Sequence, residues 1–154
     1  MRVFAVDPGS TESAWMALVD GSPLAFGKSA NVTVRDLVAT RAYAPDVVVI
    51  EEVRSYGMPV GREVFDTVRW IGRLEEAADQ VRTPVALIGR KDVVVHLCGS
   101  ARAKDANVRA ALIDRFGGTS STRKSGSLHG VVKDVWSALA IACTWFDQRT
   151  EGTR

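Results

Sequence analysis

The fold is decided by two short stretches, Arg2-Val3-Phe4-Ala5-Val6-Asp7 and Val47-Val48-Val49-Ile50-Glu51. Each is a run of mostly apolar residues that ends on a carboxylate, and such continuous runs are typical of strands covered on both faces. A helical pattern over Val32–Tyr43 separates them, so the second strand needs a crossover connection. Crossovers are right-handed and return the chain beside the strand that it left. Asp7 and Glu51 are therefore expected side by side at one edge of a sheet.

The remaining segments complete an α/β pattern. The turn residues Asp20-Gly21-Ser22-Pro23 predict a hairpin between two strands. Thr119–Ser127 is rich in Ser, Thr and Gly, contains two basic residues, and is predicted to be a mobile basic loop. The further strands are expected at Ser13–Val19, Leu24–Lys28 and Val85–Ile88, and the further helices at Pro59–Val81, Lys91–Leu97, Ala103–Phe116 and Val131–Phe146.

Length and composition indicate one domain over residues 1–154, with 46% apolar and 25% charged residues. These values exclude a disordered or collagen-like chain. No apolar run is long enough for a membrane span, and an acidic residue at position 7 comes too early for a signal peptide. Cys98 and Cys143 have no metal or redox spacing and are expected in the core. We therefore expect a cytoplasmic protein, in a bacterium or a phage-infected host.

The charge is unevenly distributed along the chain. The net charge is only +2, but Gly89–Asp134 carries nine Lys or Arg and four Asp or Glu, a net +5. Such a stretch favours a polyanionic partner such as nucleic acid. Scattered, solvated charges are the alternative.

Asp7 and Glu51 would be costly at the ends of buried strands unless a proton or a cation compensates them. Hard carboxylate ligands suit Mg²⁺ or Mn²⁺. Asp134, expected in the first turns of the last helix, would complete a three-carboxylate cluster. Such a cluster can hold two metal ions about 3.5–4 Å apart and support attack of water on a phosphodiester. The alternative is that Asp7 and Glu51 each begin a loop and Asp134 caps a helix.

Four segments together resemble RuvC-type Holliday junction resolvases. They are Val3–Ser10, Pro45–Val53, Lys91–Val108 and Val131–Thr144, in the family's order over nearly the whole chain. The resemblance implies the ribonuclease H-like fold, a five-stranded mixed sheet flanked by helices on both faces. It also implies a homodimer that cuts four-way or branched DNA, with two Mg²⁺, or Mn²⁺, ions in each active site.

Carried over to this sequence, the family's metal ligands match Asp7, Glu51 and Asp134. The family has a second acidic position three residues further along the last helix, and Ser137 stands there. His129, just before that helix, is the candidate for the missing group and a further catalytic residue.

The resemblance also implies surfaces for DNA and for a second subunit. The family's stacking aromatic corresponds to Arg54, with Tyr56 close behind. The helix over Pro59–Val81 resembles the family's dimer-forming helix, and its apolar stripe is Val60, Val64, Val68, Ile71, Leu74 and Ala78. The expected dimer contacts are Phe65, Arg69 and Trp70, and the further expected DNA contacts are Lys91, Arg102, Lys104, Arg123 and Lys124.

Parts of the sequence are also compatible with three other functions. Asp7-Pro8-Gly9-Ser10-Thr11 also resembles the first phosphate loop of sugar kinases and actin-like ATPases, which need a much longer chain. A ribonuclease H-like nuclease acting on flaps, RNA–DNA hybrids or ribosomal RNA precursors remains open. So does a non-catalytic nucleic-acid-binding domain, because Ser137 replaces an acid.

Overall fold

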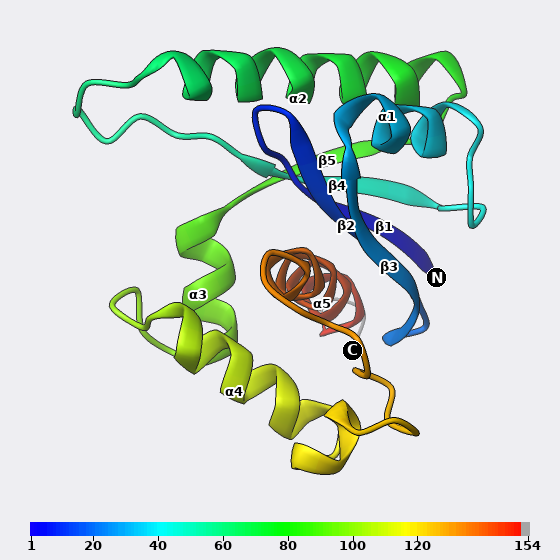
Figure 1. Cartoon of the computed structure of the whole chain (residues 1–154), viewed down its shortest axis with the longest axis vertical. Helices are drawn as coiled ribbons and strands as arrows, with labels where there is room; N and C mark the ends of the chain where they lie inside the picture. Colours follow the sequence, from blue (N-terminus) through cyan, green and yellow to red (C-terminus); the bar gives the residue numbers. More distant parts are fainter. Residues whose placement is uncertain (152–154) are drawn as a thin grey trace.

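A computed structural model describes residues 1–151, and its middle layer is a five-stranded sheet in the order β3-β2-β1-β4-β5 (Figure 1). The five strands are β1 (Arg2–Asp7), β2 (Glu12–Val19), β3 (Ser22–Ala30), β4 (Val47–Glu52) and β5 (Val85–Gly89). The helices are α1 (Asn31–Ala39), α2 (Arg62–Gln80), α3 (Arg90–Cys98), α4 (Asp105–Arg115), the short 3₁₀ helix η1 (Gly118–Thr122) and α5 (Val135–Glu151).

The pairing of β1 with β4 confirms the predicted crossover. These strands are parallel, with Val6 opposite Ile50, so that Asp7 and Glu51 follow at the same edge. β1, β2 and β3 pair antiparallel, and β5 adds parallel to β4. The predicted five-stranded mixed sheet is therefore confirmed, together with the β2–β3 hairpin and the parallel β1–β4 pair.

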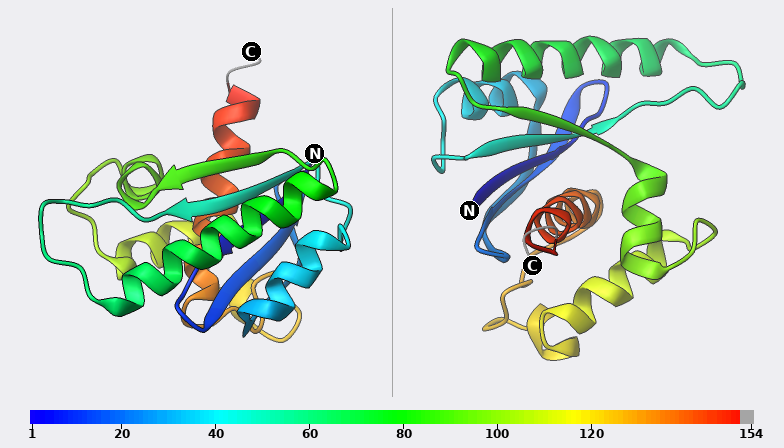
Figure 2. Two further views of the ribbon diagram at one scale, coloured as in Figure 1. Left: turned by 90° about the horizontal axis from the view of Figure 1, so that it is seen from above. Right: turned by 180° about the vertical axis from the view of Figure 1, so that it is seen from behind.

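Helices cover both faces of the sheet, as expected. One core packs α1 and α2 against Phe4, Val6, Val48 and Ile50, and the other packs α5 against the opposite face. Figure 2 shows α1 and α2 together on one side, with α3 and α4 lying beyond α5 on the other. Asp7 follows Val6 by one residue, so strand alternation turns its side chain toward α5.

The hairpin between β2 and β3 is tighter than predicted. Its two-residue turn is Asp20-Gly21, both with positive φ, and β3 begins at Ser22 instead of Leu24. Pro23 lies inside β3, which is possible because β3 is an edge strand. A register shift opposite Ala17 and Leu18 accommodates the extra residue.

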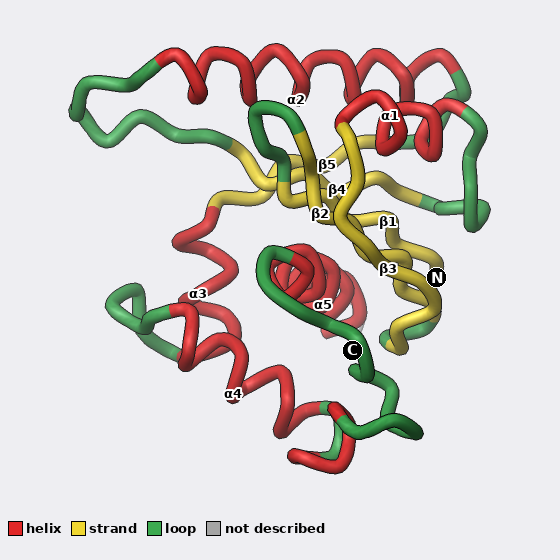
Figure 3. The backbone as a smooth tube through the Cα atoms, in the orientation of Figure 1, coloured by secondary structure: helices red, strands yellow, loops and turns green. Residues whose placement is uncertain are grey.

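Two predicted helices are too long. α1 ends at Ala39, not Tyr43, because Arg41 already takes a positive φ. Tyr43 then stacks its ring on Phe4 and Trp15. α2 begins at Arg62, not Pro59. The long connection from β4 to α2 can be followed in Figure 3.

The last helix starts later than predicted and runs further. α5 begins at Val135, because Lys133 has a φ of 47° that no helix allows, so Asp134 precedes the helix. The preceding segment is also more ordered than the expected mobile loop. Residues 118–122 form η1, Ser121 is buried, and its carbonyl accepts a hydrogen bond from the Leu128 amide.

No helix within residues 1–151 is long and apolar enough to cross a membrane.

Candidate active site

Asp7 and Glu51 lie together at the edge where β1 and β4 end. Their carboxylates are within hydrogen-bonding reach of each other. No side chain in the described part of the chain forms an ion pair with either of them. Two carboxylates this close repel when both are ionised, so the pair needs a proton or a cation.

The electrostatics of this pair follow from that position. Burial, the Glu51 carboxylate and the Asp134 carboxylate raise the pKa of Asp7 to about 7. Arg90 and a hydrogen bond from the Ser137 hydroxyl oppose that rise. Burial also raises the pKa of Glu51. A cation that binds the pair must therefore displace a proton near neutral pH.

Asp134 is close to this pair but points to a different partner. Its Oδ2 lies 2.6 Å from the Lys28 Nζ on β3. Within residues 1–151, no three carboxylate, imidazole or thiolate groups are close enough to hold one metal ion together. Asp7 and Glu51 therefore form a pair with Asp134 beside it, where Lys28 contacts it, and the role of Asp134 as a third metal ligand stays a prediction.

Three hollows surround these carboxylates. One of about 340 Å³ lies between Asp7, Asp134, Lys28 and the loop after β1. A second of about 230 Å³ runs from Asp7 and Glu51 to Arg54 and Tyr56. The third, of about 510 Å³, extends from Asp134 and Ser137 along α4 and includes Arg109 and Trp136. Together they leave the carboxylates open to a ligand from several sides.

Arg90 is a site residue that the sequence reasoning missed. It begins α3 directly after β5, lines the second and third hollows, and lowers the pKa of both Asp7 and Glu51. Its guanidinium pairs with Asp105. The available signal was its place at the end of a parallel strand beside β4, where loop residues gather around a site.

The donor set at this edge fits a hard divalent ion. Asp7 and Glu51 offer carboxylate oxygens, and Ser137 offers a hydroxyl that already bonds Asp7. Mg²⁺ is usually held by one or two carboxylates while water and phosphate oxygens complete its coordination. A carboxylate pair that borders two open hollows matches that requirement.

His129 does not lie in these hollows. Its side chain is exposed, and it lines none of the three hollows that hold the described carboxylates. The structure gives it no contact with Asp7, Glu51 or Asp134. A catalytic role for His129 therefore stays a prediction.

The predicted DNA contacts fall into two groups. Arg54 is held by Glu52 at 2.5 Å and by Asp92 at 3.2 Å, so its guanidinium is already partnered. Tyr56 is 70% exposed at the mouth of the second hollow. The other predicted contacts are exposed and form no ion pair with a described residue: Lys91, Arg102, Lys104, Arg123 and Lys124.

The predicted dimer residues lie on the first half of α2. Phe65 is 57% exposed, and Arg69 is exposed and paired with Asp66. Trp70 is half-buried under the Arg73 guanidinium, 4.6 Å from the ring centre. The predicted apolar stripe reaches the core only at its second half, because Val60 and Val68 are exposed whereas Ile71, Leu74 and Ala78 are buried.

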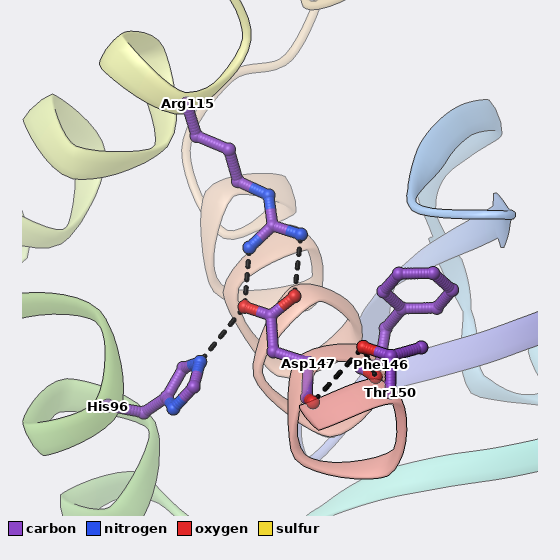
Figure 4. Close-up of polar contacts among 5 residues, drawn as sticks. All are labelled: His96, Arg115, Phe146, Asp147 and Thr150. Carbon is purple, nitrogen blue, oxygen red and sulfur yellow. Dashed lines mark hydrogen bonds and ion pairs between the residues drawn. The ribbon is translucent and has the colours of Figure 1, made fainter. Parts of the chain in front are cut away.

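A second polar cluster, which the sequence reasoning also missed, ties α3 and α4 to α5. The Arg115 guanidinium donates to both Asp147 oxygens at 2.5 and 2.7 Å, and His96 Nε2 lies 2.9 Å from Asp147 Oδ2 (Figure 4). Although burial opposes the effect, Arg115 and His96 hold the pKa of Asp147 below its usual range. This cluster fastens the helices and leaves no carboxylate unbalanced.

Comparison with known proteins yields a match at the level of structure. Neither the protein-family models nor the curated protein sequences match the chain. A structure of Thermus thermophilus RuvC superposes with a TM-score of 0.74 at 22% identity, covering 98% of this chain and 97% of that one. T. thermophilus RuvC in complex with a Holliday junction substrate gives 0.76 at 21%, covering 98% and 96%. The chain therefore has the RuvC-like form of the ribonuclease H-like fold.

Proposed function

We propose that this protein is a metal-dependent endonuclease that cuts branched DNA, with the four-way junction as its principal substrate. One observation carries the proposal: Asp7 and Glu51 are adjacent, partly buried carboxylates that no ion pair of the described chain compensates. A protein does not keep such a pair for stability, because burial raises the pKa of both groups and the Glu51 carboxylate raises that of Asp7 further. Strongly perturbed carboxylates beside a hollow are typical of active sites.

In this proposal Asp7 and Glu51 hold Mg²⁺ or Mn²⁺. A bound ion of this kind polarises a phosphoryl oxygen and lowers the pKa of water. Ser137 keeps the Asp7 carboxylate oriented through its hydrogen bond, and Arg90 brings a positive charge to the same hollow. The reaction is hydrolysis: the water oxygen bonds to phosphorus, the P–O3′ bond breaks, and a proton goes to the departing 3′ oxygen.

The choice of substrate rests on charge and on the structural likeness. The exposed basic residues of Gly89–Asp134 can neutralise backbone phosphates without reading sequence. Tyr56 can stack on an unpaired base at the mouth of the hollow that holds Asp7 and Glu51. The T. thermophilus RuvC complex holds a Holliday junction, which supports a branched substrate for this chain also.

A homodimer is the expected assembly. Met58, Val60, Phe65 and Val68 form an exposed apolar patch on the loop before α2 and on its first turns. Figure 1 shows this part of α2 and its loop reaching past the sheet. Exposed apolar patches of this kind mark interaction surfaces. A twofold dimer would present two active sites to one junction and allow paired nicks.

The dimer can be tested by sedimentation of the wild type and of Phe65→Asp. We expect the wild type to sediment as a dimer and Phe65→Asp as a folded monomer, because a charge would be buried in the interface. Val32→Asp, at an exposed apolar position on α1, is the matched control and should remain dimeric. A wild type that is monomeric at micromolar concentration would contradict this assembly.

Cleavage of a synthetic four-way junction tests the activity, with duplex, flap and RNA–DNA hybrid as comparison substrates. We expect symmetric nicks that require Mg²⁺ and fall to background in Asp7→Asn and Glu51→Gln. Asp114→Asn, which removes an exposed carboxylate on α4, should cleave normally. Equal cutting of all substrates would favour a nuclease of broader range. Junction binding without any cleavage would favour a non-catalytic domain.

A further inference from the structure

Lys28 occupies a position that its strand register fixes. Asp7 on β1 is opposite Ala14 on β2, and Ala14 is opposite Lys28 on β3. Residues directly opposite one another on neighbouring strands project from the same face of a sheet. Ala14 carries only a methyl group, so the space between the Asp7 and Lys28 side chains is open. The hollow of about 340 Å³ contains both of them.

The Lys28 ammonium is held there by Asp134. The Nζ–Oδ2 distance is 2.6 Å, and this contact joins two residues that are 106 positions apart in the chain. The side chains remain 38% and 52% exposed, so the pair is accessible from the hollow. The ammonium is therefore a fixed positive charge on the Asp134 side of the carboxylate pair.

The loop that closes this hollow is held in place by a buried network. Ser13 Oγ accepts from the Gly9 amide and donates to Asn31 Oδ1, while Asn31 Nδ2 donates to the Gly9 carbonyl at 2.9 Å. A side chain on Gly9 would lie 2.3 Å from the Glu12 carbonyl oxygen. These contacts therefore hold the loop that forms the wall of the hollow opposite Lys28.

The two halves of the candidate site thus differ in what they can hold. The Asp7–Glu51 half has two carboxylates with no ion pair and needs a cation. The hollow on the other side of Asp7 is lined by Asp7 and Asp134, and the Lys28 ammonium in it already pairs with Asp134. A second divalent ion there would find one ligand charge that is already compensated, and it would be repelled by the ammonium.

We propose that this site binds one divalent ion, between Asp7 and Glu51, and that the Lys28 ammonium takes the place of a second. The inference rests on the proposed function, since it assigns how that site carries its positive charge. It revises the two-ion expectation that the family resemblance implies. Lys28 would then meet the substrate as a fixed cation for a phosphate oxygen, a role that an ammonium serves as a point charge.

Counting bound Mn²⁺ on the full chain without DNA tests the proposal, by electron paramagnetic resonance of free Mn²⁺ together with calorimetry. We expect one ion per chain for the wild type and two for Lys28→Met, because removal of the ammonium frees Asp134. Lys28→Arg keeps the charge and should bind one. Lys124→Met is the matched control, removing an exposed lysine that lines none of the hollows, and should also bind one.

Two results would overturn the inference: two ions in the wild type, or one ion in a folded Lys28→Met. No ion in the wild type would instead overturn the proposed function, so the two failures are distinguishable. If Lys28→Met does not fold, Asp134→Asn answers the same question. It should retain the single ion with its affinity changed less than about threefold, and a loss of more than tenfold would contradict the assignment.

Discussion

A partly buried aspartate lies near each end of α5. The two aspartates differ in whether a positively charged side chain pairs with their carboxylate. Asp147, near the end of the helix, receives two hydrogen bonds from Arg115 and contacts His96. Asp7, near the beginning, faces Glu51 and Asp134, and its pKa rises to about 7. Compensation identifies Asp147 as a structural group. Asp7 has no ion-pair partner among the described residues, which supports the proposed role of Asp7 in binding a cation.

Asp147→Asn should have the largest effect on stability. It removes the charge that holds Arg115 and His96, and it leaves the partly buried Arg115 guanidinium without its two charge-assisted hydrogen bonds. We expect the free energy of unfolding to fall by about 3 kcal/mol in urea denaturation at pH 7. Asp114→Asn, exposed beside Arg115 on α4, should change it by less than about 0.5 kcal/mol. Equal effects of the two substitutions would remove the contrast.

Asp7→Asn should have the opposite effect and raise the free energy of unfolding. The shift of the pKa from 3.8 to about 7 means that the folded state binds more protons than the unfolded state between those pH values. Wild-type stability therefore falls as the pH rises through that window, by up to about 4 kcal/mol. An asparagine amide does not ionise, so this loss of stability does not occur in the variant. At pH 8 without divalent ions we expect Asp7→Asn to be more stable than the wild type by about 2 kcal/mol.

The pH dependence of that difference is the sharper measurement. Thermal unfolding in EDTA from pH 3 to pH 8 should show the two proteins converging toward pH 3, where Asp7 is mostly protonated in both the folded and the unfolded wild type. The gap should widen up to about pH 7 and then stay constant. A gap that is independent of pH would mean that the Asn side chain packs better, and the charge argument would fail.

The same contrast explains which residues the sequence could reveal. Asp7 and Glu51 were predictable because a carboxylate that ends an apolar strand breaks a local pattern, and the crossover rule places two such ends together. The same rule predicts that β1 and β4 are neighbours in the sheet. The exact helix ends do not follow from such a rule, because Tyr43 lies outside its predicted helix and stacks on Phe4 and Trp15, which only tertiary packing decides.

Lys28, Asp147 and His96 break no local pattern. Lys28 is an ordinary polar residue on an edge strand, and its partner Asp134 is 106 residues away. Asp147 lies just past the predicted end of the last helix, where a charged residue is unremarkable in sequence. Their roles exist only through contacts between elements far apart in the chain, and local propensity carries no signal for those.

His96→Leu should have the smallest effect of the three. It removes the 2.9 Å contact to Asp147 but leaves both hydrogen bonds from Arg115, so we expect a loss of about 1 kcal/mol. Val95→Ala, at the exposed neighbouring position on α3, is the control. The decisive measurement is a double-mutant cycle, because contacting residues are not additive. In the Asp147→Asn background the cost of His96→Leu should shrink to about half or less, and an undiminished cost would show that His96 acts through packing instead of through Asp147.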